Sequence, residues 1–365
     1  MKENTSEPID ISLLVCTYNR SADLRELLQT AVVQETDGEF TYEILVIDNN
    51  STDDTRQVVE SFIREGHKGL SYIFEEKQGK SHALNTGLNA VRGAYYAIVD
   101  DDFILPPDWV RGIMQGFRSH PGASFVSGKV LPLWEGGTPP GWLTEGHWSA
   151  IAMADYGDNE FVADHERQVC LLACSFRVED VRQVGGYHSD LGPKEGRTGA
   201  TEDLDLLKKL WRAGMHGVYV PNVEFLHKVS IDRASKAYHR KWHGDHGRSY
   251  AVMRAEEVER SSGRLFDVPI HLYRQAMMNC IRWLGQVLQG RHDRAFKHET
   301  ELRFFVGFVR QRYRDFRATA THGNVKEVAS FLSSIARTSK NRVPHPYPRW
   351  HSLSLLNSCA ARLKS

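Results

Sequence analysis

Short apolar runs alternate with amphipathic segments along the first hundred residues. Each run is rich in β-favouring residues, and the segments between the runs space their apolar positions as a helix does. The predicted strands and helices cover, in turn, 11–19, where the strand ends in a loop, 21–34, 42–50, 51–66, 70–76, 81–93 and 94–99. This repeat predicts a parallel sheet with helices on its faces. Polar clusters follow three strands, at 17–20, 48–51 and 100–102, so we expect a binding site beyond their carboxyl ends.

The rest of the chain changes character twice. Residues from 125 to about 157 are rich in Gly, Pro and Trp, which predicts strands joined by a long loop. A helix at 204–213 and a strand at 217–228 follow, and beyond about 231 the pattern is helical and basic. We therefore expect an α/β domain at 1–230, with a mixed, mainly parallel sheet flanked by helices, and a helical C-terminal region at 231–365.

The composition excludes several classes of protein. The chain has 365 residues, and its 46 basic and 46 acidic residues leave no net charge to favour nucleic acid. Its five cysteines form no CxxC pair, and the polar N-terminus has no apolar leader, so we expect a reduced, cytoplasmic protein. No apolar run approaches the roughly 18 residues that a membrane-spanning helix needs.

Three consecutive carboxylates follow the apolar strand at 94–99. Because side chains alternate along an extended chain, Asp100 and Asp102 are expected to point the same way and Asp101 the opposite way. Two carboxylates aimed at one point favour a cation between them, and Mg²⁺ or Mn²⁺ suits oxygen ligands and substrate phosphates. His227, at the end of a later strand, could add a nitrogen ligand. A solvated acidic turn is the alternative.

Other polar residues have both a functional and a structural interpretation. Asp48 could accept hydrogen bonds from a base or ribose, whereas Asp53 and its neighbours could simply cap the next helix. Lys80 could meet a diphosphate or be a surface lysine, and the glycine pattern around it is not that of a Walker phosphate loop. Glu202 and Asp203 could cap the helix that they precede, or one could take a proton from an attacking hydroxyl.

The segments LLVCTYNR, EILVIDNNSTDDT, GKSHALNTGLNAVRGAYYAIVDDD, VGGY, TEDLDLLKKLWRAG and VYVPNVEFLH occur in this order. Together they resemble the family 2 glycosyltransferases, nucleotide-sugar enzymes of the Rossmann-like GT-A fold, over about residues 11–247. The resemblance implies a nucleotide-sugar-binding half at 1–102 and an acceptor half at 103–230. It implies a role in binding the substrates for Thr17, Asn19, Asp48, Asn50, Lys80, Asp100 and Glu202.

The resemblance also implies a mechanism. Asp100 and Asp102 would form the DxD motif that holds Mn²⁺ or Mg²⁺ against the donor diphosphate, with His227 as a further ligand. Asp203 would be the catalytic base of a single displacement that inverts the anomeric configuration. The donor would be a UDP- or GDP-sugar, and the acceptor a sugar, a lipid-linked molecule or a small molecule in polysaccharide or glycoconjugate biosynthesis. Processive members carry QxxRW, whose nearest match here is at 279–283 with Asn in first place, so we expect a non-processive enzyme.

Two other functions remain open from the sequence. A sugar-phosphate nucleotidyltransferase would share the architecture, but it would normally open with a glycine-rich phosphate loop, and LLVCTYNRSADL has no glycine. A non-catalytic nucleotide-sugar-binding protein would be expected to have lost the DxD or TED residues, and both are intact.

The C-terminal region offers two features. Ile270, Tyr273, Met277, Ile281, Leu284 and Leu288 recur at helical spacing, with arginines among them. We favour packing of this helix against the catalytic domain over contact with an anionic membrane surface. The histidines at 239, 243 and 246 lack the glutamate of HExxH, so we expect no zinc site there but a basic, aromatic helix near phosphates or anionic lipid.

Overall fold

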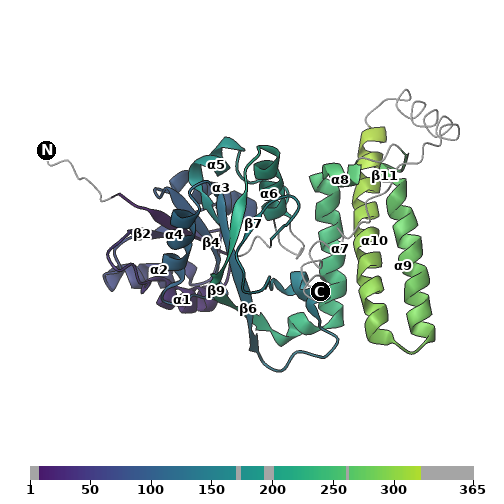
Figure 1. The fold of residues 1–365 in the computed structure, drawn as a ribbon, viewed down its shortest axis with the longest axis horizontal. Coiled ribbons are helices and arrows are strands. Elements are labelled where there is room, and N and C mark those ends of the chain that lie inside the picture. Colours follow the sequence, from purple (N-terminus) through teal and green to yellow (C-terminus); the bar gives the residue numbers. More distant parts are fainter. Residues whose placement is uncertain (1–7, 170–173, 193–200, 260–262, 322–365) are drawn as a thin grey trace.

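A nine-stranded sheet forms the centre of the chain. The computed structural model describes residues 8–169, 174–192, 201–259 and 263–321. The strand order is β3-β2-β1-β4-β8-β6-β9-β5, and β7 pairs with β9 (Figure 1). The strands are β1 (Ile11–Thr17), β2 (Tyr42–Asp48), β3 (Leu70–Phe74), β4 (Tyr95–Asp100), β5 (Phe103–Ile104), β6 (Phe125–Glu135), β7 (Phe161–Ala163), β8 (Ser175–Arg177) and β9 (Gly217–Ser230).

Helices cover both faces of this sheet. Its long pairings, among β3, β2, β1 and β4 and between β6 and β9, are parallel, whereas those of β5, β7 and β8 are short and antiparallel. All seven residues of β1 are buried, as expected for a central strand covered on both sides. The helices are α1 (Ser21–Ala31), α2 (Thr55–Arg64), α3 (Lys80–Ala90), α4 (Trp109–Ser119), α5 (Val178–Gln183) and α6 (Glu202–Arg212).

Two apolar layers hold these helices on the sheet. One layer joins side chains of α1, α2 and α4 to one face, and the other joins those of α3, α5 and α6 to the opposite face. The expected GT-A architecture, a mixed, mainly parallel sheet between helices with a helical C-terminal region, is confirmed. The predicted division at residue 230 stays a prediction.

One carboxylate ties the first two strand ends together. Asp53 accepts a hydrogen bond from the backbone N–H of Ser21 (2.9 Å) and another from that of Thr55 (3.1 Å), so it serves the first turns of α1 and α2. Ser21 is the first residue of α1, and the residue before it, Arg20, makes no side-chain cap bond. The loops that carry the polar clusters are therefore fixed to each other.

The C-terminal region is a row of helices beside the sheet. The helices α7, α10 and α9 lie side by side, with α9 farthest from the sheet (Figure 1). The elements are η3 (Ile231–Ala234), α7 (Lys236–Met253), α8 (Glu256–Glu259), β10 (Arg264–Leu265), β11 (Val268–Pro269), α9 (Ile270–Leu288) and α10 (His292–Thr321). Within the described ranges no helix has the length and apolarity needed to cross a bilayer.

An aromatic cluster joins this row to the catalytic part. Trp142 packs edge-on against Phe296 of α10 (ring centroids 4.9 Å apart) and His239 of α7 (5.1 Å), and against His147 of η1 (Glu145–Ile151). His239 is fully buried, and burial lowers its pKa to about 4. The expectation that this histidine lies near phosphates or lipid is therefore wrong, because it is part of the helix packing.

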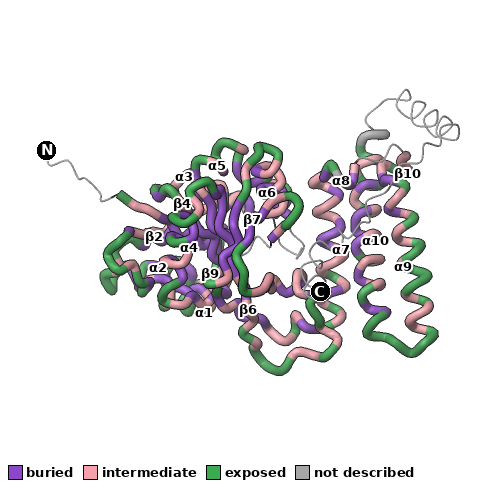
Figure 2. The backbone as a smooth tube through the Cα atoms, viewed as in Figure 1, coloured by how far each residue is buried: buried purple, intermediate pink, exposed green. Residues whose placement is uncertain are grey.

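The apolar stripe of α9 does not pack against the catalytic domain. Tyr273 contacts Phe305 of α10 (5.3 Å between ring centroids), but Met277, Ile281 and Leu288 are exposed, and the α9 tube in Figure 2 is coloured exposed or intermediate over most of its length. Our preferred interpretation of this stripe is therefore wrong, since the stripe faces outward.

Close contact between α7 and α10 depends on glycine. A Cβ on Gly307 would collide with the backbone carbonyl of Gly244, whereas one on Gly285 of α9 would have no neighbour within 4 Å. We predict that Gly307→Ala lowers stability by about 1–3 kcal/mol, because the two backbones must separate. Gly285→Ala should be neutral or stabilise by about 0.5–1 kcal/mol. Thermal unfolding of both variants tests this, and equal shifts in Tm would contradict the packing.

Candidate functional site

The predicted site residues meet at the carboxyl edge of the sheet. In the parallel ladder Thr17 lies opposite Asp48, and Cys16 lies opposite Asp100. The turn after Asp100 and the end of β9 lie beside them, because β5 pairs with β9 and places Phe103 opposite His227. The sequence thus brings three separate strand ends to one edge.

The three aspartates do not alternate as expected. Strand β4 ends at Asp100, and Asp101 and Asp102 form a turn. Asp100 pairs with Nζ of Lys80 (2.5 Å), whereas one guanidinium nitrogen of Arg20 contacts both Asp101 (2.5 Å) and Asp102 (3.0 Å). The expectation that Asp100 and Asp102 point the same way, and Asp101 the opposite way, is therefore wrong, because the extended backbone stops one residue into the triplet.

Asp102 and His227 form a buried pair. The backbone N–H of Lys228 donates to the carbonyl of Asp102 (2.9 Å), and Nε2 of His227 lies 3.4 Å from the Asp102 carboxylate. Arg233 of η3 contacts both, 3.2 Å from His227 Nε2 and 3.4 Å from Asp102. Burial alone would raise the pKa of Asp102, but His227, Arg20 and Arg233 outweigh it and hold that pKa below its usual range.

This pair fits part of the predicted metal site. A carboxylate oxygen and an imidazole nitrogen are both suitable donors for Mn²⁺, and Nδ1 of His227 is buried with no hydrogen-bond partner among the residues that the structure describes. Such an ion needs few protein ligands where phosphates complete its shell. In the part of the chain that the structure describes, no three potential ligands gather at one point, since Asp100 pairs with Lys80 instead. Asp102 and His227 therefore fit the ion, and Asp100 does not lie with them.

Asp101 binds two neighbouring side chains of the protein. Its carboxylate accepts a hydrogen bond from Oγ1 of Thr17 (2.8 Å) as well as the contact from Arg20. Burial raises its pKa to about 7, although Arg20 opposes this shift. Thr17 is buried and points at this carboxylate, so its predicted role at the nucleotide stays a prediction. Arg20, which follows the strand in the YNR segment, was not predicted.

The predicted nucleotide residues lie on the two tied loops. Asp48 accepts hydrogen bonds from the backbone N–H of Ser51 (2.9 Å) and from the hydroxyl of Tyr72 (2.7 Å), so both of its carboxylate oxygens have partners within the protein. Asn19 and Asn50 both have positive φ, at 51° and 66°. These conformations are unusual outside glycine and cluster at functional sites. Contact of any of the three with a nucleotide stays a prediction.

Asn49 is a further site residue that sequence reasoning missed. It accepts a hydrogen bond from the N–H of Gly79 (2.7 Å) and donates to the carbonyl of Lys77 (2.7 Å). These bonds fix the loop that ends at Lys80 and thereby set the start of α3. The sequence signal that could have identified Asn49 was its position directly after Asp48, at the end of a strand.

Glu202 and Asp203 lie in the first turn of α6. One carboxylate oxygen of each is buried without a hydrogen-bond partner among the described residues. Burial raises the pKa of Asp203 to about 6, against the opposing charge of Lys80. Burial and the nearby Asp203 raise the pKa of Glu202 well above its usual value. A buried carboxylate of this kind is suited to accept a proton near neutral pH.

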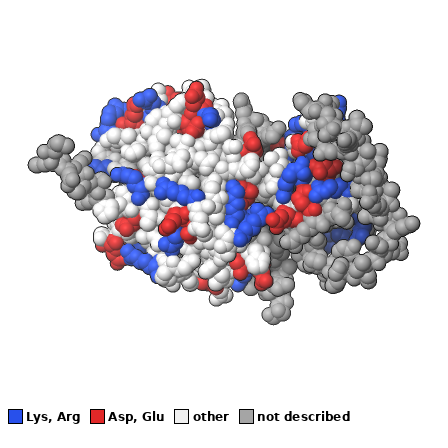
Figure 3. Space-filling view, turned by 90° about the horizontal axis from the view of Figure 1, so that it is seen from above, with Lys and Arg blue, Asp and Glu red and all other residues white. Residues whose placement is uncertain are grey.

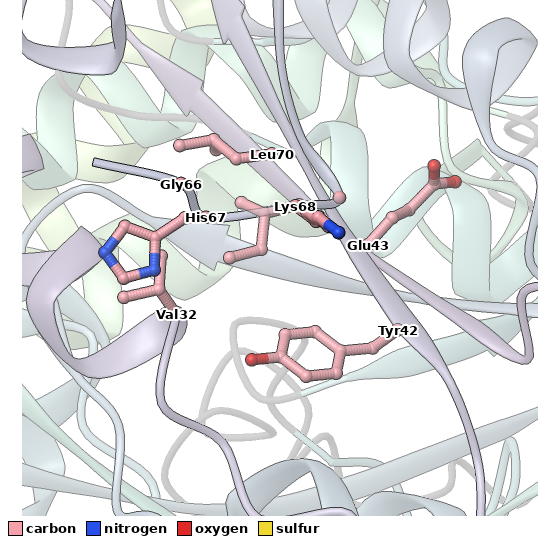
Figure 4. Close-up of a pocket in the computed structure, with 9 residues that line it drawn as sticks. Val32, Tyr42, Glu43, Gly66, His67, Lys68 and Leu70 are labelled. Atoms are coloured by element: carbon pink, nitrogen blue, oxygen red, sulfur yellow. The ribbon is translucent and has the colours of Figure 1, made fainter. Parts of the chain in front are cut away.

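The hollow shown in Figure 4 lies elsewhere. It is lined by the start of β2, including Tyr42 and Glu43, and by the turn around Lys68, at the opposite end of the strand from Asp48. On the face seen in Figure 3, Lys and Arg side chains are interspersed with Asp and Glu rather than gathered by sign. Neither feature competes with the carboxyl edge as the site.

Comparisons with known proteins identify the family of this chain. A family model described as "Glycosyl transferase family 2" matches residues 12–151, and one described as "Glycosyl transferase family group 2" matches residues 96–318, more than half of the chain. The chain belongs to the family 2 glycosyltransferases. It is accordingly an enzyme that transfers sugars.

Two curated relatives of this glycosyltransferase are similar to more than half of the chain. A glucosyl-dolichyl phosphate glucuronosyltransferase of Haloferax volcanii is 24% identical over 226 residues, which cover 60% of this chain and 69% of the relative. The succinoglycan biosynthesis protein ExoM of Rhizobium meliloti is 25% identical over 253 residues, 69% of this chain and 78% of the relative.

A mannosyltransferase from Pyrobaculum calidifontis, solved with GDP-Man and Mn²⁺, is 18% identical. It covers 93% of this chain and 82% of its own, with a TM-score of 0.49. This likeness is distant, and the site described above is argued from the residues of this chain alone.

Proposed function

We propose that this glycosyltransferase is inverting, metal-dependent and non-processive, and that it moves a sugar from a UDP- or GDP-sugar to an acceptor hydroxyl. The proposal rests on one observation, which is that the site contains two groups of charged side chains with different surroundings. Asp102 and His227 lie among arginines. Asp203 is buried near the Lys80–Asp100 ion pair, and one of its carboxylate oxygens has no hydrogen-bond partner among the described residues. One group suits a leaving diphosphate, and the other suits proton transfer.

The part of the site that we propose binds the leaving diphosphate contains cationic side chains and one buried carboxylate. Arg20, Lys80 and Arg233 can donate to phosphate oxygens, because guanidinium and ammonium groups bind them strongly. Asp102 and His227 would hold the divalent ion. When bound, Mn²⁺ or Mg²⁺ would neutralise charge on the leaving diphosphate as a Lewis acid. Arg233 already contacts both proposed ligands, so we expect it to shift toward the diphosphate when the donor binds.

Asp203 supplies the proton chemistry. Its carboxylate would accept the proton of the acceptor hydroxyl while that oxygen forms a bond to the anomeric carbon. The bond from this carbon to the diphosphate oxygen breaks in the same step, and its electron pair leaves with the nucleoside diphosphate. Attack from the opposite face inverts the configuration, and no covalent enzyme intermediate forms.

The acceptor class is proposed from the relatives' names. One relative is named for a dolichyl phosphate-linked sugar and another for succinoglycan biosynthesis. They support a lipid-linked or polysaccharide acceptor, with one sugar added per encounter. A reducing, cytoplasmic location is part of the proposal, because the five cysteines of the sequence form no CxxC pair.

A panel of nucleoside-diphosphate sugars tests the donor and the metal. Incubation with Mn²⁺ should release nucleoside diphosphate slowly from one UDP- or GDP-sugar, because water can replace the acceptor. EDTA should abolish the release, and excess Mn²⁺ should restore it. Release that continues undiminished in EDTA would contradict metal dependence while leaving the transferase assignment intact.

Substitution of Asp203 tests the proposed base. Asp203→Asn should lower kcat by a factor on the order of 10²–10⁴, because general base catalysis contributes about this much, with donor Kd nearly unchanged. Glu202→Gln should retain a much larger rate, since burial already favours the neutral form of Glu202.

The pH profile of kcat/KM provides the second readout for Asp203. The reactive form is the carboxylate, so the wild-type rate should fall as pH drops through the Asp203 pKa of about 6. Equal losses of donor binding and turnover in Asp203→Asn would count against the assignment, as would equal kcat losses in the two variants.

A further inference from the structure

Helix α9 exposes a row of large apolar side chains. Its outer face consists of Ile270, Met277, Met278, Ile281, Leu284 and Leu288, whose side chains are between 43% and 78% exposed. Toward the protein, only Leu272 is fully buried, and the side-chain oxygens of Gln275 and Gln286 are buried without hydrogen-bond partners in the described part of the chain. Soluble proteins rarely expose a contiguous apolar stripe of this kind unless it binds something.

The chain has no net charge, but its basic and acidic residues are distributed unevenly between its two parts. Residues 231–365 contain 25 Lys and Arg against 11 Asp and Glu, whereas residues 1–230 contain 21 against 35. Helix α9 itself has no acidic residue, and Arg274 and Arg282 are exposed beside its outer face. Charge asymmetry of this kind favours an acidic partner for the C-terminal region.

The possible binding partners of the outer face of α9 differ in whether their charge complements that of the helix. A second copy of the chain would bring the arginines of two α9 helices together, with no acidic residue on either helix. Residues 322–365 contain seven Lys and Arg and one acidic residue, so they do not complement α9 either. An anionic lipid surface complements both the apolar stripe and the positive charge. We propose that the outer face of α9 lies on an anionic membrane surface and holds the enzyme there as a peripheral protein.

The arrangement of the helices fits this role. Helix α9 is the outermost of the row α7, α10 and α9 (Figure 1). Its 19 residues span about 28 Å, enough to lie along the lipid headgroups over several turns. Membrane binding by this face does not depend on the glycosyltransferase proposal, and it can be measured without activity.

Flotation of the full chain with vesicles tests the proposal. The wild type should float with phosphatidylcholine vesicles that contain phosphatidylglycerol at about 0.1 M salt, and it should bind far less at about 1 M salt, where the Debye length is about 3 Å. Vesicles of phosphatidylcholine alone should bind weakly. The double substitution of Met277→Glu with Ile281→Glu should reduce partitioning at least about tenfold, because it removes apolar area and adds negative charge.

A double substitution elsewhere on the surface controls for the effect of added negative charge alone. Val33 and Ile63 are exposed apolar residues of the catalytic part, and Val33→Glu with Ile63→Glu should float like the wild type. Absence of wild-type flotation at low salt would overturn the proposal, as would equal flotation of the α9 variant. If the α9 variant breaks a dimer in light scattering, a second copy covers the face. If it fails to alter flotation but lowers Tm, the chain itself covers the face.

Discussion

The short antiparallel pairing of β5 with β9 determines how the site is built. It places Phe103 opposite His227 and fixes Asp102 through the backbone bond to Lys228. Two residues far apart in sequence thereby become a buried acid–imidazole pair. Without this pairing the carboxylates after β4 would form a solvated turn with little reason to gather cations.

Burial then gives the carboxylates different chemistry. Asp102 is surrounded by His227, Arg20 and Arg233, which keep it ionised despite its burial. Burial also desolvates Asp203, and there the opposing charge of Lys80 does not outweigh it, so the pKa of Asp203 rises to about 6. Lys80 belongs to the environment of Asp203, because it carries charge near Asp203 and also pairs with Asp100. The environment of each acid, rather than its residue type, separates leaving-group stabilisation from proton transfer.

The sequence predicts the local elements well because their apolar periodicity is a local property. It therefore identified the strand ends after which Asp48 and Asp100 lie. The orientation of Asp101 and Asp102 could not be predicted, because the end of β4 depends on a pairing with distant β9. Arg20 and Arg233 were missed for the same reason, since each contacts the site only through the tertiary fold. The stripe of α9 was recognised, but periodicity shows which face is apolar and not what that face meets.

The anomeric configuration of the first product tests the central claim most directly. Proton NMR of the sugar released by slow donor hydrolysis, recorded before mutarotation, needs no knowledge of the acceptor. Single displacement with Asp203 as base predicts release of the anomer opposite to that of the donor. Release of the donor's own anomer would contradict the account, because it would require a double displacement or front-side attack at this site.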